Sequence, residues 1–376
     1  ATGMESSSLR RGPCCAVLAL SCATAASALR LPAVGTVYPA SRSALRMQVQ
    51  TAAPPSAFDW SALDGAYLIT CDEGGERMRS AKAVLSSFNL ADSTQVRVFD
   101  PDPKDKIRGC YNSHIAVLEE AERTFGDRRD YSVLVLEDNV GPSHATGNPE
   151  MPRVVSDVLS FAGSEEGWDV IHLAYIMYVP GLSVLRVDNP AKPGSVREHL
   201  MQVQVTNSQS ALGNTAYVIS KQGVDAVLRE HRERGFRVPI PDLMAELFPT
   251  SRYAAYPMPF HRSATIRSIV NPQFDDLRQI MFRPSWTGFW EKVLVSTGLS
   301  TSIVFPSLIA LVVLLFLVST GQAATAAWEL VTAPQEFHGN VVLIGLETVV
   351  SAFSLAFILY GASLAPKPAE DAKAKA

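Results

Sequence analysis

Residues 131–140, YSVLVLEDNV, form a short apolar run that ends in two acids and an amide. A run of this length and composition predicts a strand that is buried on both faces of a parallel sheet. Ligands of open α/β sheets bind outside the carboxyl ends of the strands, which is where Glu137, Asp138 and Asn139 fall. The stretch therefore predicts a central strand and the sheet edge at which a site is built.

Similar apolar runs lie on both sides of this stretch and alternate with segments of helical periodicity. Strands that alternate with helices indicate an α/β fold with a mainly parallel sheet. The expected strands cover residues 66–71, 95–99, 168–174 and 215–220, and the expected helices cover residues 76–88 and 112–125.

Composition narrows the class of protein. The 376 residues are 47% hydrophobic and 19% charged, which is normal for a folded chain. Lys and Arg number 33 against 37 Asp and Glu, so no broad basic field favours nucleic acid as a partner. Only Cys71 and Cys110 lie in the expected folded part, which is too few for a disulfide framework or a cysteine-rich zinc site.

Residues 1–57 are expected to be a targeting leader and linker. Arg10 and Arg11 precede the weakly apolar run CCAVLALSCATAASA, as in a secretory signal peptide. The following residues carry Arg and Ser but no acid before Asp59, which is the composition of a transit peptide. The two parts together resemble the leader of algae whose plastid lies inside extra membranes. A plastid membrane, thylakoid or envelope, is therefore the expected location, and a signal peptide for the ER and Golgi is the alternative.

Two apolar segments, residues 297–320 and 340–364, are long enough for a transmembrane hairpin, followed by a disordered tail at residues 365–376. The second segment contains Glu347, which is expected to face a partner, a cofactor or the interface, or to be protonated. Lys and Arg flank the pair but are missing from the loop between, which places the domain and the tail on one side of the membrane. The aromatic side chains expected at the headgroup level are Trp286, Phe289 and Trp290.

The segment QEFHGNVVLIG, residues 335–345, faintly resembles the start of a chlorophyll-binding helix in light-harvesting proteins. That resemblance implies chlorophyll bound by His338. The segment departs from the pattern, because Gln335 stands at the family's glutamate position and Asn340 at its arginine position. The alternative is a plain polar helix start.

Six segments in one order resemble glycosyltransferase family 25, which includes lipooligosaccharide and collagen galactosyltransferases. They are AYLITCDEGGERMRSAKAVL from residue 66, RGCYNSHIAVLEEA from 108, LVLEDN from 134, DVIHLAY from 169, NTAYVISKQGVDAVL from 214 and VPIPDLMAEL from 238. The resemblance implies a GT-A type nucleotide-sugar-binding domain over residues 58–290. It further implies a UDP-sugar donor, UDP-galactose most often, with Mn²⁺ or Mg²⁺ and an inverting transfer.

The resemblance also assigns roles. Asp138 and Asn139 would bind the metal and the donor's diphosphate, Glu137 would bind the donor by orienting both, and Asp242 would be the general base. The family's E-D-D is E-D-N here, and an amide lacks the charge of a carboxylate, so metal affinity should fall. The residues implied to contact the donor are Asp72, Arg77, Ser113 and His114.

Each role has a structural alternative. Asp242 and Ser113 each suit a helix N-cap, and His114 suits a structural histidine. Asp72 and Arg77 suit a surface ion pair. Cys110 is expected to be a packed side chain rather than a nucleophile.

Two functions follow from the sequence. The first is a membrane-anchored enzyme that moves a sugar from a UDP-sugar to a lipid, protein or glycan acceptor. The second is a non-catalytic scaffold subunit of a plastid membrane complex, such as one associated with a photosystem, in which only the transferase fold persists.

Overall fold

The computed structural model describes residues 58–164, 167–177, 179, 181–188, 196–205, 212–269, 283–332 and 341–363. They belong to two compact units, one within residues 50–302 and the other including residues from Ile303 onward. The leader at 1–57, the tail at 365–376 and His338 lie outside the described residues. Predictions about them therefore stay predictions.

The first unit is built on an 8-stranded sheet in the order β2-β1-β3-β8-β5-β9-β7-β6. The stretch 131–140 supplies its third strand, β3, as the sequence predicts. In sheet order the strands are β2 Thr94–Val98, β1 Gly65–Thr70, β3 Ser132–Glu137, β8 Ala216–Ser220, β5 Val170–Ala174, β9 Arg252–Ala255, β7 Val196–Val205 and β6 Leu182–Asp188. A second, two-stranded sheet pairs β4, Val140–Pro142, with β10, Phe260–Arg262.

The sheet is mixed, although most of its strands run in one direction. Strands β2, β1, β3, β5, β9 and β6 share that direction, whereas β8 and β7 are antiparallel to their neighbours. The prediction of an α/β fold with a mainly parallel sheet is thus confirmed in outline. The expected strand at 215–220 exists as β8, but its reversed direction is set by tertiary pairing.

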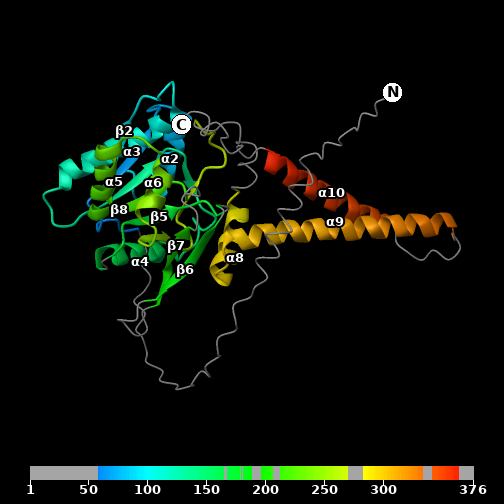
Figure 1. Cartoon of the computed structure of the whole chain (residues 1–376). Coiled ribbons are helices and arrows are strands. Elements are labelled where there is room, and N and C mark those ends of the chain that lie inside the picture. The colour runs from blue at the N-terminus through cyan, green and yellow to red at the C-terminus, as the bar shows by residue number, and fades with distance from the viewer. Residues whose placement is uncertain are drawn as a thin grey trace, which may run out of the picture. The chain divides into compact units, whose positions relative to one another are not determined.

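Helices cover both faces of the sheet (Figure 1). On one face α2, Glu76–Ser87, and α4, Met151–Ser164, pack on inward residues such as Leu68 and Leu134. On the other face α3, Lys106–Phe125, α5, Lys221–Arg234, and α6, Ile240–Leu247, pack on Tyr67 and Val133. Successive residues of one strand serve opposite faces, which explains why the central strands are apolar throughout.

Helix α3 begins earlier than its sequence pattern predicts. The expected start near residue 112, with Ser113 as a cap, is wrong, because Asp105 is the N-cap and accepts hydrogen bonds from the N–H groups of Ile107 and Arg108. The apolar periodicity that marks a helix in sequence appears only where α3 meets the sheet. Its first turn is polar and partly exposed, so periodicity alone misses it.

Replacing Asp105 with alanine is expected to lower the free energy of unfolding by about 1 kcal/mol, because two N–H groups at the start of α3 lose their acceptor. Asp105→Asn keeps an oxygen acceptor and should behave like the parent. Chemical denaturation of both variants measures the difference. Equal stability of the alanine variant and the parent would contradict the cap.

Two long helices form the second unit. Helix α9 covers Thr301–Thr332, and its stretch Thr301–Glu329 is long and apolar enough to cross a membrane by length and composition. Helix α10 covers Val341–Ser363, but its apolar part, Val342–Ala356, is shorter than a span. The two helices touch where the Thr348 hydroxyl donates to the Ser319 carbonyl oxygen at 3.1 Å. One helix among the described residues is therefore long and apolar enough for a span, and both the membrane anchor and the hairpin stay predictions.

Helix α8, Pro284–Thr297, belongs to the first unit and is held by a buried acid. Glu291 is fully buried and accepts hydrogen bonds from the Tyr175 hydroxyl at 2.7 Å and the Met258 N–H at 2.9 Å. Among the aromatic residues expected at the headgroup level, Trp286 and Phe289 are exposed. Trp290 is buried, so it serves packing within the domain instead.

Candidate functional site

A cavity of about 180 Å³ opens at the carboxyl ends of β1 and β3, the edge that the sequence predicts. Its wall combines cationic, anionic and small polar side chains. The lining residues are Ile69, Thr70, Cys71, Arg77, Asp100, Pro101, Asp102, Lys106, Gly109, Cys110, Ser113, Glu137, Asp138, Asn139, Arg262, Ser268 and Ile269.

Asp138 is buried and held by two partners. Arg77 donates to its Oδ1 from Nε, at 3.0 Å, and from Nη2. The Thr70 hydroxyl donates to Oδ2 at 2.8 Å. Arg77 therefore forms its ion pair with Asp138. The alternative of a surface ion pair between Arg77 and Asp72 is wrong.

Glu137 lies at the end of a hydrogen-bonded chain. The His114 Nε2 is 3.2 Å from Glu137 Oε1, and its Nδ1 is 2.9 Å from the Tyr217 hydroxyl. Asn139 donates from Nδ2 to Glu137 Oε2 at 2.7 Å. Burial alone would raise the pKa of Glu137. The hydrogen bonds from His114 and Asn139 lower the pKa by more than burial raises it, so the carboxylate stays charged.

The structure bears on the structural alternatives for His114, a structural histidine, and Ser113, a helix N-cap. His114 is fully buried in the Tyr217–Glu137 chain, which is a structural setting, yet its partner Glu137 lines the cavity. Ser113 lines the cavity while its hydroxyl donates to the Gly109 carbonyl oxygen at 3.0 Å. Burial raises the pKa of the Cys110 thiol, with Glu137 adding to the shift, which agrees with a protonated, packed cysteine.

The loop before α3 closes one side of the cavity. Asp102 accepts hydrogen bonds from the N–H of Asp105 at 2.9 Å and from the Arg108 side chain, and these lower its pKa to about 2. Gly109 permits this close approach, since a Cβ there would lie 2.9 Å from the Cβ of Asp102. Gly109, in the family-25-like segment that starts at residue 108, therefore has a packing role.

Three predicted residues do not line this cavity, namely Asp72, Asp242 and the buried His114. Asp72 is exposed in the turn after β1, where its N–H donates to the Thr70 hydroxyl at 3.0 Å. Asp242 lies in the first turn of α6, whose N-cap is Pro239, so the cap alternative is wrong as well. Burial raises the pKa of Asp242, with Glu246 adding to the shift.

Sequence reasoning missed several residues of the wall, among them Asp100, Thr70, Lys106 and Arg262. Thr70 ends β1 and was expected only as part of a strand, although it holds Asp138. Lys106 begins α3 and was hidden by the misplaced helix start. Arg262 comes from β10, which reaches the site by pairing with β4, and no local signal marks it.

The fit of a hard divalent cation at Asp138 and Asn139 can be tested on these contacts. Asn139 Oδ1 is buried without a hydrogen-bond partner among the described residues, as a ligand oxygen would be. However, both carboxylate oxygens of Asp138 already accept from Arg77 and Thr70, and the guanidinium supplies the positive charge. This arrangement does not fit Mn²⁺ or Mg²⁺ at Asp138 unless Arg77 leaves.

Comparisons with known proteins give one distant structural similarity. No protein-family model matches the chain, and no curated protein matches it. Among solved structures the chain is similar to one described as "Crystal structure of a glycosyltransferase involved in the glycosylation of the major capsid of PBCV-1". The identity is 10% and the TM-score 0.32, and the similarity covers 57% of this chain and 98% of that one. Similarity at this level assigns no activity to the chain.

Proposed function

We propose that the first unit is a glycosyltransferase that moves a sugar from a nucleoside diphosphate sugar. One observation carries the proposal, namely a cavity at the carboxyl ends of β1 and β3 whose wall holds Arg77, Lys106 and Arg262 beside acids. The cations suit a diphosphate, and the acids suit sugar hydroxyls. Three of the six segments that resemble family 25, those from residues 66, 108 and 134, contribute lining residues to this cavity. The resemblance favours UDP-galactose as the donor.

In this proposal the leaving diphosphate is neutralised by side chains of the protein. Arg77 is already oriented by Asp138 and would present its remaining donors to the phosphates. Its Nη1 donates to the Arg267 carbonyl oxygen at 2.6 Å, which fixes the side chain further. The implied manganese is then not needed at Asp138.

In this proposal the general base is Asp100 and not Asp242, which lies outside the cavity lining. Inverting transfer requires a base within hydrogen-bond reach of the acceptor hydroxyl. Asp100 lines the cavity and also the open groove beside it, which includes Phe99, Lys104 and Asn112. That groove would admit a lipid, protein or glycan acceptor.

Calorimetry of the full chain in detergent, with UDP-galactose and UDP-glucose in EDTA and in Mn²⁺, tests the proposal. Binding of at least one donor in EDTA is expected, with Asp100→Asn retaining donor binding while losing transfer. Binding that appears only with Mn²⁺ would mean that the cation displaces Arg77 from Asp138. A folded chain that binds neither donor under either condition would overturn the transferase.

The scaffold function is favoured by one observation. Every carboxylate oxygen of Asp138 and Glu137 accepts from, or faces, a protein side chain, so the acids at the strand end are internally satisfied. Copurification with a membrane complex, together with absent donor binding, would select this function.

Fluorescence of a fusion to residues 1–60 tests the plastid location.

A further inference from the structure

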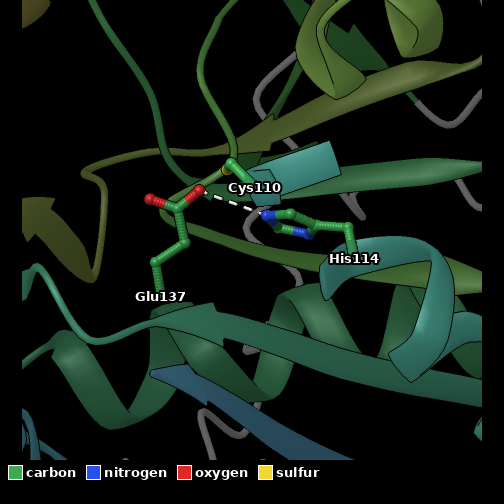
Figure 2. Close-up of side chains that lie close together, drawn as sticks. All are labelled: Cys110, His114 and Glu137. Atoms are coloured by element: carbon green, nitrogen blue, oxygen red, sulfur yellow. Dashed lines mark hydrogen bonds and ion pairs between the residues drawn. The ribbon is translucent and has the colours of Figure 1, made fainter. Parts of the chain in front are cut away.

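A second set of potential ligands, distinct from Asp138 and Asn139, lies in the cavity wall and directly behind it. The Sγ of Cys110, a ring nitrogen of His114 and a carboxylate oxygen of Glu137 all lie within 4.8 Å of one another. Figure 2 shows the three side chains pointing toward one another, with the His114 ring facing the Glu137 carboxylate. We propose that Cys110, His114 and Glu137 bind a borderline-soft divalent cation of the Zn²⁺ class.

The three side chains come from two elements, helix α3 and strand β3. Cys110 and His114 are four residues apart on α3, so they occupy one face of the helix. Glu137 is the last residue of β3, which α3 packs against through the apolar residues between them. The ligand positions are thus fixed by a helix and a strand rather than by a loop, which favours a preformed site.

The spacing is close to that of a tetrahedral site. Zinc bonds of about 2.0 Å to nitrogen or oxygen and 2.3 Å to sulfur place ligand atoms roughly 3.3 to 3.6 Å apart. His114 Nε2 and Glu137 Oε1 are already 3.2 Å apart. The Cys110 sulfur, within 4.8 Å of a His114 ring nitrogen and of a Glu137 carboxylate oxygen, has to approach by only about 1 Å.

Partners behind the ligands orient them. The Tyr217 hydroxyl lies 2.9 Å from His114 Nδ1 and leaves Nε2 as the nitrogen that faces Glu137. Asn139 holds Oε2 of Glu137 at 2.7 Å and leaves Oε1 toward the histidine. Support of this kind on the far side of a histidine and a carboxylate is usual around bound metals.

The site also has an open side. Cys110 and Glu137 line the cavity, whereas His114 is fully buried behind them. A cation held by three protein ligands keeps its fourth position for water or an anionic oxygen in the cavity. On binding, the Cys110 thiol releases its proton to solvent and the sulfur becomes the anionic ligand. The proposal does not depend on sugar transfer.

Titration of the full chain with Co²⁺, a spectroscopic substitute for Zn²⁺, tests the site without any nucleotide present. Every sample carries Cys14→Ser, Cys15→Ser and Cys22→Ser and has no polyhistidine tag, so sulfur bands report only on Cys71 and Cys110. We expect one equivalent of Co²⁺ to give sulfur-to-cobalt absorption, which one equivalent of Zn²⁺ then removes.

Two variants decide whether the ligands are those proposed. Cys110→Ser should abolish the sulfur bands. His114→Gln removes a direct ligand and should weaken binding at least 10-fold, since loss of a mere supporting partner already costs about 10- to 100-fold. Cys71→Ser, at the other cysteine of the cavity wall, should leave the spectrum unchanged. Absence of sulfur bands in the parent, or bands that survive Cys110→Ser and disappear in Cys71→Ser, would overturn the site. Circular dichroism shows whether each variant is folded.

Discussion

Replacing Arg77 with alanine is expected to weaken nucleotide-sugar binding on the order of 100-fold, the scale of truncating one partner of a buried charge pair. Arg77 is the cation that faces Asp138, whose side chain is only 5% exposed. Without it, an unpaired carboxylate remains in the cavity wall and repels the donor's diphosphate. The same loss should lower the free energy of unfolding by about 3 kcal/mol.

Lysine should not restore this function. Arg77 donates to one oxygen of Asp138 from both Nε and Nη2 and reaches the Arg267 carbonyl oxygen from Nη1, whereas an ammonium group cannot span these acceptors. Arg79→Ala is the matched control, because Arg79 lies on the same helix, is exposed, and its side chain donates to the Gly74 carbonyl oxygen rather than to a cavity residue. Calorimetry measures donor binding for all three variants. Donor binding unchanged in Arg77→Ala would show that the diphosphate lies elsewhere.

Replacing Glu291 with glutamine is expected to raise the stability of the chain at about pH 8 and to leave it nearly unchanged below about pH 5. Burial raises the pKa of Glu291 to about 7, from 4.5 when unfolded. The folded chain therefore retains a proton that the unfolded chain has lost between these values. The stability that Glu291 contributes is complete below about pH 4.5 and falls as pH rises toward 7. The loss is about 3 kcal/mol.

Glutamine keeps the acceptor that Glu291 presents to Tyr175 and Met258 but cannot ionise. His144 faces the same acid, with its Nε2 3.2 Å from Glu291 Oε2. Burial lowers the pKa of His144, so its own contribution to stability is lost as pH falls, opposite in sign to that of Glu291. The difference between the parent and Glu291→Gln isolates the acid, since both retain the histidine.

Thermal unfolding of both proteins in detergent, followed by tryptophan fluorescence from about pH 5 to pH 8, measures this difference. His144→Gln should preserve the fall in stability that Glu291 causes. A pH-independent difference between the parent and Glu291→Gln would show that the acid remains ionised throughout.

The sequence predicted those elements whose apolar pattern is local. Strands β1, β2, β5 and β8 lie within two residues of their expected bounds, β3 lies inside the expected stretch 131–140, and α2 ends one residue early. Strands β6, β7 and β9 were not predicted, because they lie on the far side of the sheet from the patterned stretches and their identity depends on pairing. The start of α3 was missed for a similar reason, since a polar first turn depends on its cap.

By itself, the sequence determined that an apolar strand ends in Glu137, Asp138 and Asn139 and that a long apolar helix follows the domain. These features are contiguous along the chain, so composition and period reveal them. Only the tertiary structure decided what the acids touch. Arg77 and Thr70 hold Asp138, and His114 faces Glu137, across separations of 61, 68 and 23 residues. Such contacts are made by packing α2, α3 and β1 around β3, and no local pattern encodes which partner meets which oxygen.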